Sequence, residues 1–423
     1  MFFEEFDFED AVLDGIVSMG FTSTTPIQEA TIPSLLDGRD LLGVAQTGTG
    51  KTASYLLPII NRIYRGEFSP DKVKALIVAP TRELVQQIDR QIQGFGYFTG
   101  CTSIAIYGGT DGFAWEQQSR STRLGVDIIV ATPGRLLDLI NTGSAQLGDI
   151  RYFVLDEADR MLDMGFYEDI IAIRKSIAQE CQIAMFSATM PPKIATLAED
   201  LLHEPVKIEL AVAKPPDSIM QCVYFCYEAQ KLAIIDSLYE AEGSGEKTRK
   251  SVFFASTKKK VHLLATNLSR MGFNVAEMHS DLDQTVRDQV MRDFKGGYVD
   301  MLVATDIVAR GIDIDDIEVV VNFDMPHDAE DYVHRIGRTA RGNDGRGIAI
   351  TLVTSDDFKS FAALEHFLGK RLYVMPLDPS LGEAPTYEPE LYATRQNRTK
   401  KDKKRSHASK SQGRPRGQRK QKE

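Results

Sequence analysis

Short apolar segments rich in β-branched residues alternate with helical patterns along most of this chain. In the first half, the strand-like segments are residues 75–80, 103–109, 127–133, 152–159 and 183–189, and helical patterns such as 82–92 lie between them. Segments that are apolar without alternation are typical of strands buried on both faces. The order strand, helix, strand therefore predicts an α/β fold, in which helices cover both faces of a parallel sheet.

The second half of the chain repeats this plan. Its strand-like segments are residues 222–228, 251–257, 274–280, 300–306, 319–324 and 347–354. Between the halves, Pro215 and Pro216 cannot continue a helix and lack backbone donors, which favours a linker. We predict a first domain at 1–210, a linker at 211–220, a second domain at 221–375 and an extension with a basic tail at 376–423.

The charge of the chain is distributed unevenly. The whole chain has a net charge of -10, whereas residues 395–423 hold thirteen Lys or Arg against two acidic residues, a net of +11 that leaves -21 elsewhere. The tail has no large apolar residue that could offset the entropy of ordering, so we expect it to be disordered. The asymmetry indicates a polyanion partner, with a solubilising role as the alternative.

Several classes of protein are disfavoured by simple features. No apolar segment approaches the roughly 18 to 20 residues that span a bilayer, and the acidic start lacks the basic and apolar regions of a signal peptide. The four cysteines include no C-x-x-C pair, so they indicate neither a disulfide framework nor a metal site. We therefore expect a cytoplasmic protein that does not contact membranes.

Residues 45–52, AQTGTGKT, follow a strand-like segment and precede an apolar helical pattern. Gly48 and Gly50 let the backbone approach phosphate closely, and successive N–H groups there can bind an anion. Lys51 would reach the β- and γ-phosphates, and the Thr52 hydroxyl would ligate Mg²⁺. The general pattern begins with Gly, where this chain has Ala45. The predicted nucleotide-binding loop consists of Ala45, Gln46, Thr47, Gly48, Thr49, Gly50, Lys51 and Thr52.

A triphosphate site also needs a carboxylate for the metal and a group that orients water. Asp156 and Glu157 lie together at the end of an apolar strand-like segment. We predict that Asp156 holds Mg²⁺ and that Glu157 positions and deprotonates the attacking water. The site would then bind a nucleoside triphosphate together with Mg²⁺. A solvated turn is the alternative interpretation of these acidic residues.

Taken in order, AQTGTGKT, VLDEAD and FSAT resemble the DEAD-box family of ATP-dependent RNA helicases over about residues 3–370. The resemblance implies two tandem RecA-like domains that close around ATP and RNA. It also implies RNA-stimulated ATP hydrolysis coupled to local strand separation or to remodelling of RNA–protein complexes. In its overall sequence the chain resembles bacterial RhlE-like members of this family.

The resemblance assigns further residues to the nucleotide. Residues 20–28, GFTSTTPIQ, are similar to the family's adenine-reading motif, which includes Thr25 and Gln28. A Gln amide can bond the N6 and N7 edge of adenine, and Phe21 offers a face for stacking. Phe3 has the family's spacing before this motif, and Asp313 would meet the ribose.

The family also implies residues that link hydrolysis to RNA. Arg335 and Arg338 would be arginine fingers that reach the γ-phosphate, and such a finger contributes about 10³ to 10⁵ in rate. Lys51, Asp156 and Glu157 complete the predicted catalytic set. The residues expected to couple the acidic cluster to strand separation are Asp159, Ser187, Thr189 and His334.

The predicted RNA contacts are backbone amides, short hydroxyls and cations, which suit phosphate and ribose rather than base edges. They are Pro80, Thr81, Arg82, Gly108, Gly109, Thr132, Pro133 and Arg135 in the first domain, and Ser256, Arg287, Thr305, Asp306 and Arg310 in the second. We therefore expect a monomer that binds single-stranded and duplex RNA without sequence preference. Two alternatives stay open, a DNA-directed helicase on the same fold and an ATP-gated RNA clamp that unwinds little.

Overall fold

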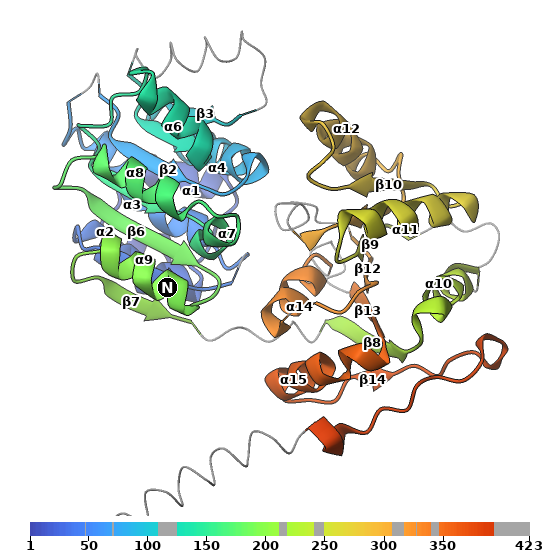
Figure 1. Cartoon of the computed structure of the whole chain (residues 1–423). Helices are drawn as coiled ribbons and strands as arrows, with labels where there is room; N and C mark the ends of the chain where they lie inside the picture. The colour runs from blue at the N-terminus through green and yellow to red at the C-terminus, as the bar shows by residue number, and fades with distance from the viewer. Residues whose placement is uncertain are drawn as a thin grey trace, which may run out of the picture. The chain divides into compact units, whose positions relative to one another are not determined.

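The computed structural model describes residues 1–46, 48–69, 72–108, 125–210, 218–240, 249–306, 317–326, 328–339 and 347–392. The chain divides into two compact units, Met1–Ala213 and Lys214–Glu423 (Figure 1). The division falls inside the segment 211–220, where the sequence predicts a linker.

The first unit is built on a parallel sheet of seven strands in the order β3-β4-β2-β5-β6-β1-β7. Four of its five internal strands are buried at every residue, as their uninterrupted apolar sequences predict. The strands are β1 (Leu41–Val44), β2 (Ala75–Val78), β3 (Ser103–Ile106), β4 (Ile128–Ala131), β5 (Tyr152–Leu155), β6 (Gln182–Ser187) and β7 (Val206–Glu209).

Helices cover both faces of this sheet and form two separate cores. One core includes apolar residues of α1 (Asp10–Ser18), α2 (Pro26–Leu36), α3 (Lys51–Tyr64) and α4 (Arg82–Phe95). The other includes residues of α6 (Pro133–Asn141), α7 (Ala158–Asp163), α8 (Tyr167–Lys175) and α9 (Pro192–Leu201). Helix α4 shows how the sequence directs this packing, because Val85, Ile88 and Ile92 form one buried stripe at helical spacing.

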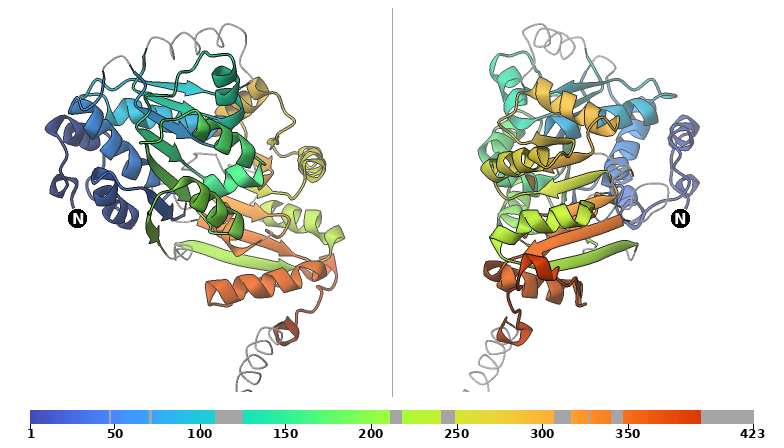
Figure 2. Two further views of the ribbon diagram at one scale, coloured as in Figure 1. Left: turned by 60° about the vertical axis from the view of Figure 1, so that its left-hand side comes forward. Right: turned by 90° about the vertical axis from the view of Figure 1, so that its right-hand side faces the viewer.

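The second unit has a parallel sheet of seven strands in the order β10-β11-β9-β12-β13-β8-β14. The strands are β8 (Ile219–Phe225), β9 (Ser251–Phe254), β10 (Val275–Met278), β11 (Met301–Ala304), β12 (Val319–Asn322), β13 (Gly347–Val353) and β14 (Tyr373–Val374). Helices α12 (Gln284–Lys295), α14 (Ala329–Ile336) and α15 (Phe358–Leu368) pack on one face, and α10 (Lys231–Glu240) and α11 (Lys258–Arg270) pack on the other. Figure 2 shows helices on both sides of each sheet, and the predicted fold class is confirmed.

Three elements differ from the sequence-based expectation. Strand β8 begins at Ile219, inside the predicted linker, because Ile219 is buried and pairs with Gly347 of β13. The edge strands β7 and β14 were not predicted. In β7 every second residue is exposed, and β14 has only two residues, so neither has the fully apolar pattern of a central strand.

The segment after residue 375 packs against the second unit as far as it is described. The ring centroid of Tyr387 lies 5.0 Å from that of Phe225 and 5.2 Å from that of Phe361. Gln230 Nε2 donates a hydrogen bond of 2.8 Å to the carbonyl oxygen of Leu381. These contacts make the start of the predicted extension part of the second unit, whereas the basic tail lies outside the described residues. Among the described helices, none has the length and apolar character required to cross a membrane.

Candidate functional site

The loop between β1 and α3 has the backbone conformation that the glycines allow. Gly48 and Gly50 have φ values of 81° and 91°, in the left-handed region that disfavours other residues. A Cβ atom at Gly50 would lie 2.5 Å from Gln28 Nε2, so a larger residue would also collide with its neighbour. Thr49 Oγ1 donates a 2.7 Å hydrogen bond to the Gln46 carbonyl oxygen, which tightens the turn. Thr47 lies outside the described residues.

Lys51 begins α3 and is held over this loop. Its side chain is 6% exposed, and Nζ donates a 2.6 Å hydrogen bond to the carbonyl oxygen of Ala45. A carbonyl oxygen carries only a partial charge, so it does not neutralise the ammonium. Thr52 follows in the first turn of α3, where unpaired N–H groups and the helix dipole favour an anion. The loop, Lys51 and the helix start thus form a site suited to phosphate.

Gln28 connects α2 to the phosphate loop. Its Oε1 accepts a 2.9 Å hydrogen bond from the Thr25 backbone N–H, and its Nε2 donates one of 3.0 Å to the Gly50 carbonyl oxygen. The side chain is fully buried, whereas sequence reasoning without the family resemblance would treat Gln28 as an exposed helix residue. Any change at Gln28 is therefore transmitted directly to the loop.

The two aromatic residues near Gln28 form one cluster with α4. Phe21 packs edge-on against Phe95 at a centroid distance of 5.3 Å and against Phe3 at 6.4 Å. Phe3 is 4% exposed and belongs to the core, while Phe21 is only partly buried. Phe21 thus retains surface for a ligand, and Phe3 supports it from the core side.

Asp156 follows β5 and has both carboxylate oxygens bonded. Oδ2 accepts a 2.8 Å hydrogen bond from the Tyr55 hydroxyl, and Oδ1 accepts one of 3.0 Å from the Glu157 backbone N–H. Burial raises the pKa of Asp156 above its ordinary value, although the charge of Lys51 and the Tyr55 hydrogen bond oppose that rise. Sequence reasoning missed Tyr55, which lies one helical turn after Lys51, a spacing that places both on one face of α3.

Glu157 occupies a strained position between β5 and α7. Its φ of 52° is left-handed, which costs a non-glycine residue of order 1 to 3 kcal/mol. Arg160 Nη1 lies 3.2 Å from Glu157 Oε2, and both side chains are largely buried. This buried ion pair aims the carboxylate, and Arg160 is a second residue that the sequence did not single out.

Asp159 joins the acidic cluster to the end of β6. Its Oδ2 accepts hydrogen bonds from the Thr189 backbone N–H at 3.0 Å and from Thr189 Oγ1 at 3.1 Å, and from the Ala188 N–H at 3.2 Å. Ser187 Oγ in turn donates a 2.7 Å bond to the Thr189 carbonyl oxygen. Thr189 is therefore hydrogen-bonded to the acidic cluster through both its backbone N–H and its hydroxyl.

The predicted RNA-contacting segments of the first unit follow adjacent strands. Strands β2 and β4 pair in parallel, so residues 80–82 and 132–135 follow strands at the same edge of the sheet. Thr81 and Thr132 also precede α4 and α6, Pro133 is the first residue of α6, and Thr81 Oγ1 accepts from the Leu84 N–H at 3.4 Å. Arg82 and Arg135 are partly exposed, as is Gly108 after β3, whereas Pro80 is buried. Gly109 lies outside the described residues.

Arg335 differs from the prediction that it reaches a phosphate. Its Nε and Nη2 form a bidentate ion pair with Asp306 at 2.6 and 2.8 Å. Its Nη1 donates to Asn322 Oδ1 at 3.2 Å and to the Asp324 carbonyl oxygen at 2.8 Å, and the side chain is only 3% exposed. The guanidinium thus braces the second unit, and this geometry does not support a role as an arginine finger.

Arg338 lies just after the end of α14 and remains the candidate finger within the described residues. It is 6% exposed, and Nε lies 3.3 Å from the carbonyl oxygen of His334, one helical turn before.

Most of the predicted RNA contacts in the second unit have internal partners. Ser256 donates through its N–H and Oγ to Asp324 Oδ2 at 2.8 and 2.7 Å. Thr305 is 8% exposed, and the Asp306 carboxylate is occupied by Arg335. These residues brace the edge of the sheet, and the prediction that Asp306 contacts RNA directly is not supported. Arg287 lies on α12, partly exposed, and its Nη1 donates to Gln284 Oε1 at 3.0 Å. Arg310 and Asp313 lie outside the described residues.

Comparison with known proteins identifies both units. The DEAD/DEAH box helicase family matches residues 25–197, and the helicase conserved C-terminal domain matches residues 230–343. The chain is 39% identical over 388 residues to the ATP-dependent RNA helicase CshA of Listeria monocytogenes, covering 91% of this chain and 71% of that protein. It is 40% identical over 384 residues to the DEAD-box ATP-dependent RNA helicase CshA of Geobacillus kaustophilus, covering 90% and 79%.

Solved structures agree with these matches. Dbp5 of S. cerevisiae bound to RNA and ADP BeF3 superposes with a TM-score of 0.77 and 33% identity, over 88% of this chain and 95% of that one. Mss116p bound to ssRNA and AMP-PNP superposes with a TM-score of 0.78 and 28% identity, over 90% and 80%.

Proposed function

The chain belongs to the DEAD-box family of ATP-dependent RNA helicases, and from this premise we propose how its residues divide the work. It hydrolyses ATP, and we propose that RNA stimulates this hydrolysis by drawing the two units together. The closure would separate short RNA strands or remodel RNA–protein complexes. The observation that carries this proposal is a set of three hydrogen bonds around the site. Lys51 bonds Ala45 within the phosphate loop, Tyr55 of the same helix bonds Asp156, and Asp159 bonds Thr189.

The phosphates of ATP bind at the start of α3 in this proposal. Lys51 exchanges its bond with the Ala45 carbonyl oxygen for bonds to the β- and γ-phosphates, which carry more charge. Thr52 and Asp156 would hold Mg²⁺, which neutralises charge on the phosphate oxygens. The donor set fits this metal, because a hydroxyl and a buried carboxylate are the oxygen ligands that Mg²⁺ prefers.

Glu157 is the proposed general base for the attacking water. Its carboxylate is aimed by Arg160 and by the strained backbone before α7, so it needs little reorganisation. Arg338 of the second unit would supply positive charge to the γ-phosphate only when both units engage. Such an arrangement makes turnover depend on closure and therefore on RNA.

Adenine recognition is assigned to Gln28 and Phe21. The Gln28 amide has one further N–H and one further lone pair beyond its two bonds within the unit, and these match the N6 and N7 edge of adenine. Because Gln28 also bonds Gly50, occupancy of the base site is felt at the phosphate loop. Phe21 would stack on the base, and Asp313 would meet the ribose.

Coupling to RNA runs through Asp159 and the end of β6. A shift of the acidic cluster during hydrolysis moves Thr189 directly, since Asp159 holds its N–H and its hydroxyl. His334 of the second unit would receive this signal when the units close. The proposed RNA contacts are to phosphate and ribose, so single-stranded and duplex RNA would bind without sequence preference.

We expect a monomer that acts in the cytoplasm. The cysteines Cys101, Cys181, Cys222 and Cys226 are all free thiols, which suits a reducing compartment. That this chain belongs to an RhlE-like subgroup of the family stays a prediction.

The test is ATP hydrolysis measured without nucleic acid, with single-stranded RNA and with DNA of the same sequence. Strong stimulation by RNA alone is the expected result, because a contact to the 2′-hydroxyl distinguishes RNA from DNA. Equal stimulation by DNA would favour the alternative of a DNA-directed helicase on the same fold. A fast rate that is indifferent to both would contradict the closure mechanism. RNA held for long periods without strand displacement would favour the ATP-gated clamp.

A further inference from the structure

The phenol of Tyr55 reaches the carboxylate of Asp156 from inside the core of the first unit. The hydroxyl lies 2.8 Å from Asp156 Oδ2, and the two residues are 1% and 2% exposed. The phenol carries the proton of this pair, so Tyr55 donates and the Asp156 carboxylate oxygen accepts. Water does not compete for this hydrogen bond at such burial.

Packing leaves the Tyr55 ring little freedom. It belongs to the apolar core between the sheet and helices α1 to α4, and its centroid lies 5.3 Å from that of Phe186 on β6. Tyr55 sits on α3 four residues after Lys51, so one rigid helix presents both the lysine and the phenol to the phosphate site. The position of the hydroxyl is therefore coupled to the position of Lys51.

The carboxylate of Asp156 is held at both oxygens. The backbone N–H of Glu157 binds Oδ1 at 3.0 Å, and Tyr55 binds Oδ2. Each carboxylate oxygen has a second lone pair, which remains for a cation or for water bound to a cation. Rotation of the carboxylate would break both bonds, so its free lone pairs keep one direction.

We propose that Tyr55 is a positioning residue for the magnesium–nucleotide site, acting through the carboxylate of Asp156. This inference rests on the proposed role of Asp156 and deepens it. A group that orients a metal-binding carboxylate without touching the metal typically changes metal affinity by about 10- to 100-fold when it is removed. The hydroxyl of Tyr55 has the distance, burial and rigidity that such a role requires.

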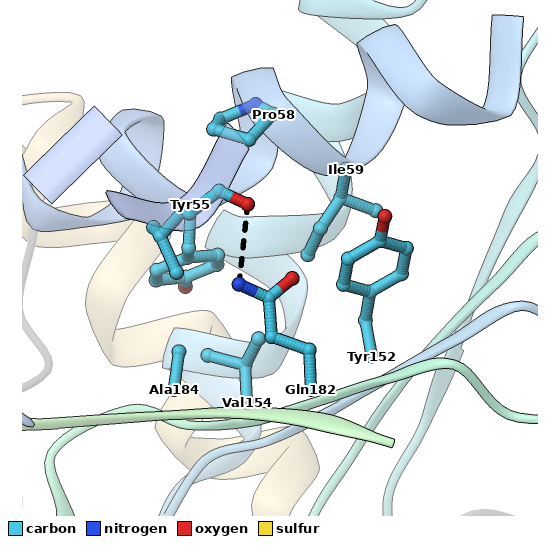
Figure 3. Close-up of a pocket in the computed structure, with 8 residues that line it drawn as sticks. Tyr55, Pro58, Ile59, Tyr152, Val154, Gln182 and Ala184 are labelled. Carbon is cyan, nitrogen blue, oxygen red and sulfur yellow. Dashed lines mark hydrogen bonds between the residues drawn. The ribbon is translucent and has the colours of Figure 1, made fainter. Parts of the chain in front are cut away.

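Tyr152 provides a matched control within the same unit. It lies on β5 and is 4% exposed, and its hydroxyl has no hydrogen-bond partner within the described residues. Tyr55 and Tyr152 both line a pocket of ≈ 10 Å³, and Figure 3 shows their rings on either side of Gln182. Removal of the Tyr152 hydroxyl leaves Asp156 untouched.

The experiment measures binding of a fluorescent ATP analogue to the full chain, with magnesium and with EDTA. The variants are Tyr55→Phe and Tyr152→Phe beside the unchanged protein. The expected result is that Tyr55→Phe reduces the tightening caused by magnesium by about tenfold and leaves affinity in EDTA unchanged. Tyr152→Phe should behave like the unchanged protein in both conditions.

A double-variant cycle separates positioning from a general effect on structure. In an Asp156→Asn background, where the metal-binding carboxylate is absent, Tyr55→Phe should have no further effect on the magnesium dependence. Circular dichroism melting checks that each variant is folded at the assay temperature. If Tyr55→Phe does not fold, Tyr55→Met replaces it, since its flexible side chain fills the space without a hydroxyl.

Two outcomes would overturn different statements. If magnesium tightens binding equally in Tyr55→Phe and in the unchanged protein, the role of Tyr55 is wrong and the metal site stands. If magnesium has no effect on the unchanged protein, the proposed magnesium site itself is wrong, and the role of Tyr55 falls with it.

Discussion

The two units share one topology but treat the same two positions in opposite ways. Their strands follow the same order when each unit is numbered from its own first strand. In each, the first strand leads to a helix that begins with lysine, Lys51 or Lys231. In each, an aspartate follows the fifth strand, Asp156 directly after β5 and Asp324 two residues after β12.

In the second unit these two residues neutralise each other. Lys231 is 2% exposed, and its Nζ lies 3.1 Å from Asp324 Oδ1 and 2.8 Å from Glu228 Oε2. Asp324 also accepts hydrogen bonds from Ser256 and Lys260. Residues 226–230 contain no glycine, so the connection lacks the left-handed turns of the phosphate loop.

In the first unit the corresponding lysine and aspartate do not bond each other. Lys51 bonds a carbonyl oxygen, and Asp156 bonds a phenol and an amide, so neither has a charged hydrogen-bond partner among the described residues. Phosphate and Mg²⁺ can complete them. The shared fold thus places a lysine and an aspartate at one sheet edge in both units, and the loop residues decide whether the pair forms a structural bond or a binding site.

The largest effect on ATP hydrolysis is expected at Glu157 of the first unit. The residue at the corresponding position of the second unit, directly after Asp324, is Met325. Glu157→Gln should lower kcat for ATP by about 10² to 10⁴, the usual contribution of a general base. ATP binding should persist, and RNA release should become slow. Steady-state hydrolysis and RNA dissociation kinetics measure this, with Glu168→Gln as a control at an exposed acid on α8. Rapid RNA release from Glu157→Gln would count against its assignment as the base.

The next prediction concerns the replacement of each of the two lysines, Lys51 and Lys231, by methionine. Lys51→Met should abolish most nucleotide affinity with little loss of stability. Lys231→Met should leave nucleotide affinity unchanged and lower the free energy of unfolding by about 1 to 3 kcal/mol, since Asp324 loses one of its two cationic partners and keeps Lys260. Nucleotide titration and calorimetry measure the two effects. Similar losses of affinity in both variants would break the comparison.

The stabilising charge of Asp324 can also be tested by measuring the thermal midpoint over a range of pH. Burial alone would raise the pKa of Asp324, but hydrogen bonds from Lys260 and Ser256 and the charge of Lys231 hold it well below the ordinary value. The pKa is depressed on folding, so the stabilisation is complete above the unfolded value of about 3.9 and is lost as the pH falls below it. The acid-induced fall in thermal midpoint should be shallower in Asp324→Asn.

A smaller effect is expected at Gln28. Gln28→Ala removes the proposed adenine contact and the bonds to Thr25 and Gly50. Discrimination of ATP from GTP should fall by about 1 to 3 kcal/mol, the range for one bidentate contact to a base. Competition binding with the two nucleotides measures it. Unchanged discrimination would refute the adenine role, even if both affinities fell together through the phosphate loop.

The smallest effect is expected from the tail. Deleting residues 393–423 should raise the RNA concentration for half-maximal ATPase stimulation several-fold at low salt, and the difference should fade as salt rises. The ATP concentration dependence should stay the same, because no residue of the site is removed. Residues 376–392 are retained in this variant since Tyr387 packs in the second unit. An RNA dependence identical to that of the full chain would leave the tail as a solubilising segment.

Local sequence predicts most of the helices and strands and the chemistry of the phosphate loop. Apolar runs specified the central strands, and Gly48, Gly50 and Lys51 specified the phosphate loop, because a contiguous stretch carries all the information for each. The acidic residues Asp156 and Glu157 could be recognised from the sequence for the same reason, because they are adjacent in the chain. The edge strands β7 and β14 escaped prediction because exposed or very short strands lack the buried pattern.

Which side chains contact one another over long sequence distances depends on the tertiary structure. Tyr55 meets Asp156 across 101 residues, Lys231 meets Asp324 across 93, and Arg335 meets Asp306 across 29. The order of strands in the sheet creates these neighbours, and sequence spacing carries no record of it. The sequence therefore predicted that Arg335 binds a phosphate, whereas in the structure its buried guanidinium forms an ion pair with Asp306. A buried carboxylate is a stronger partner for the guanidinium than water is.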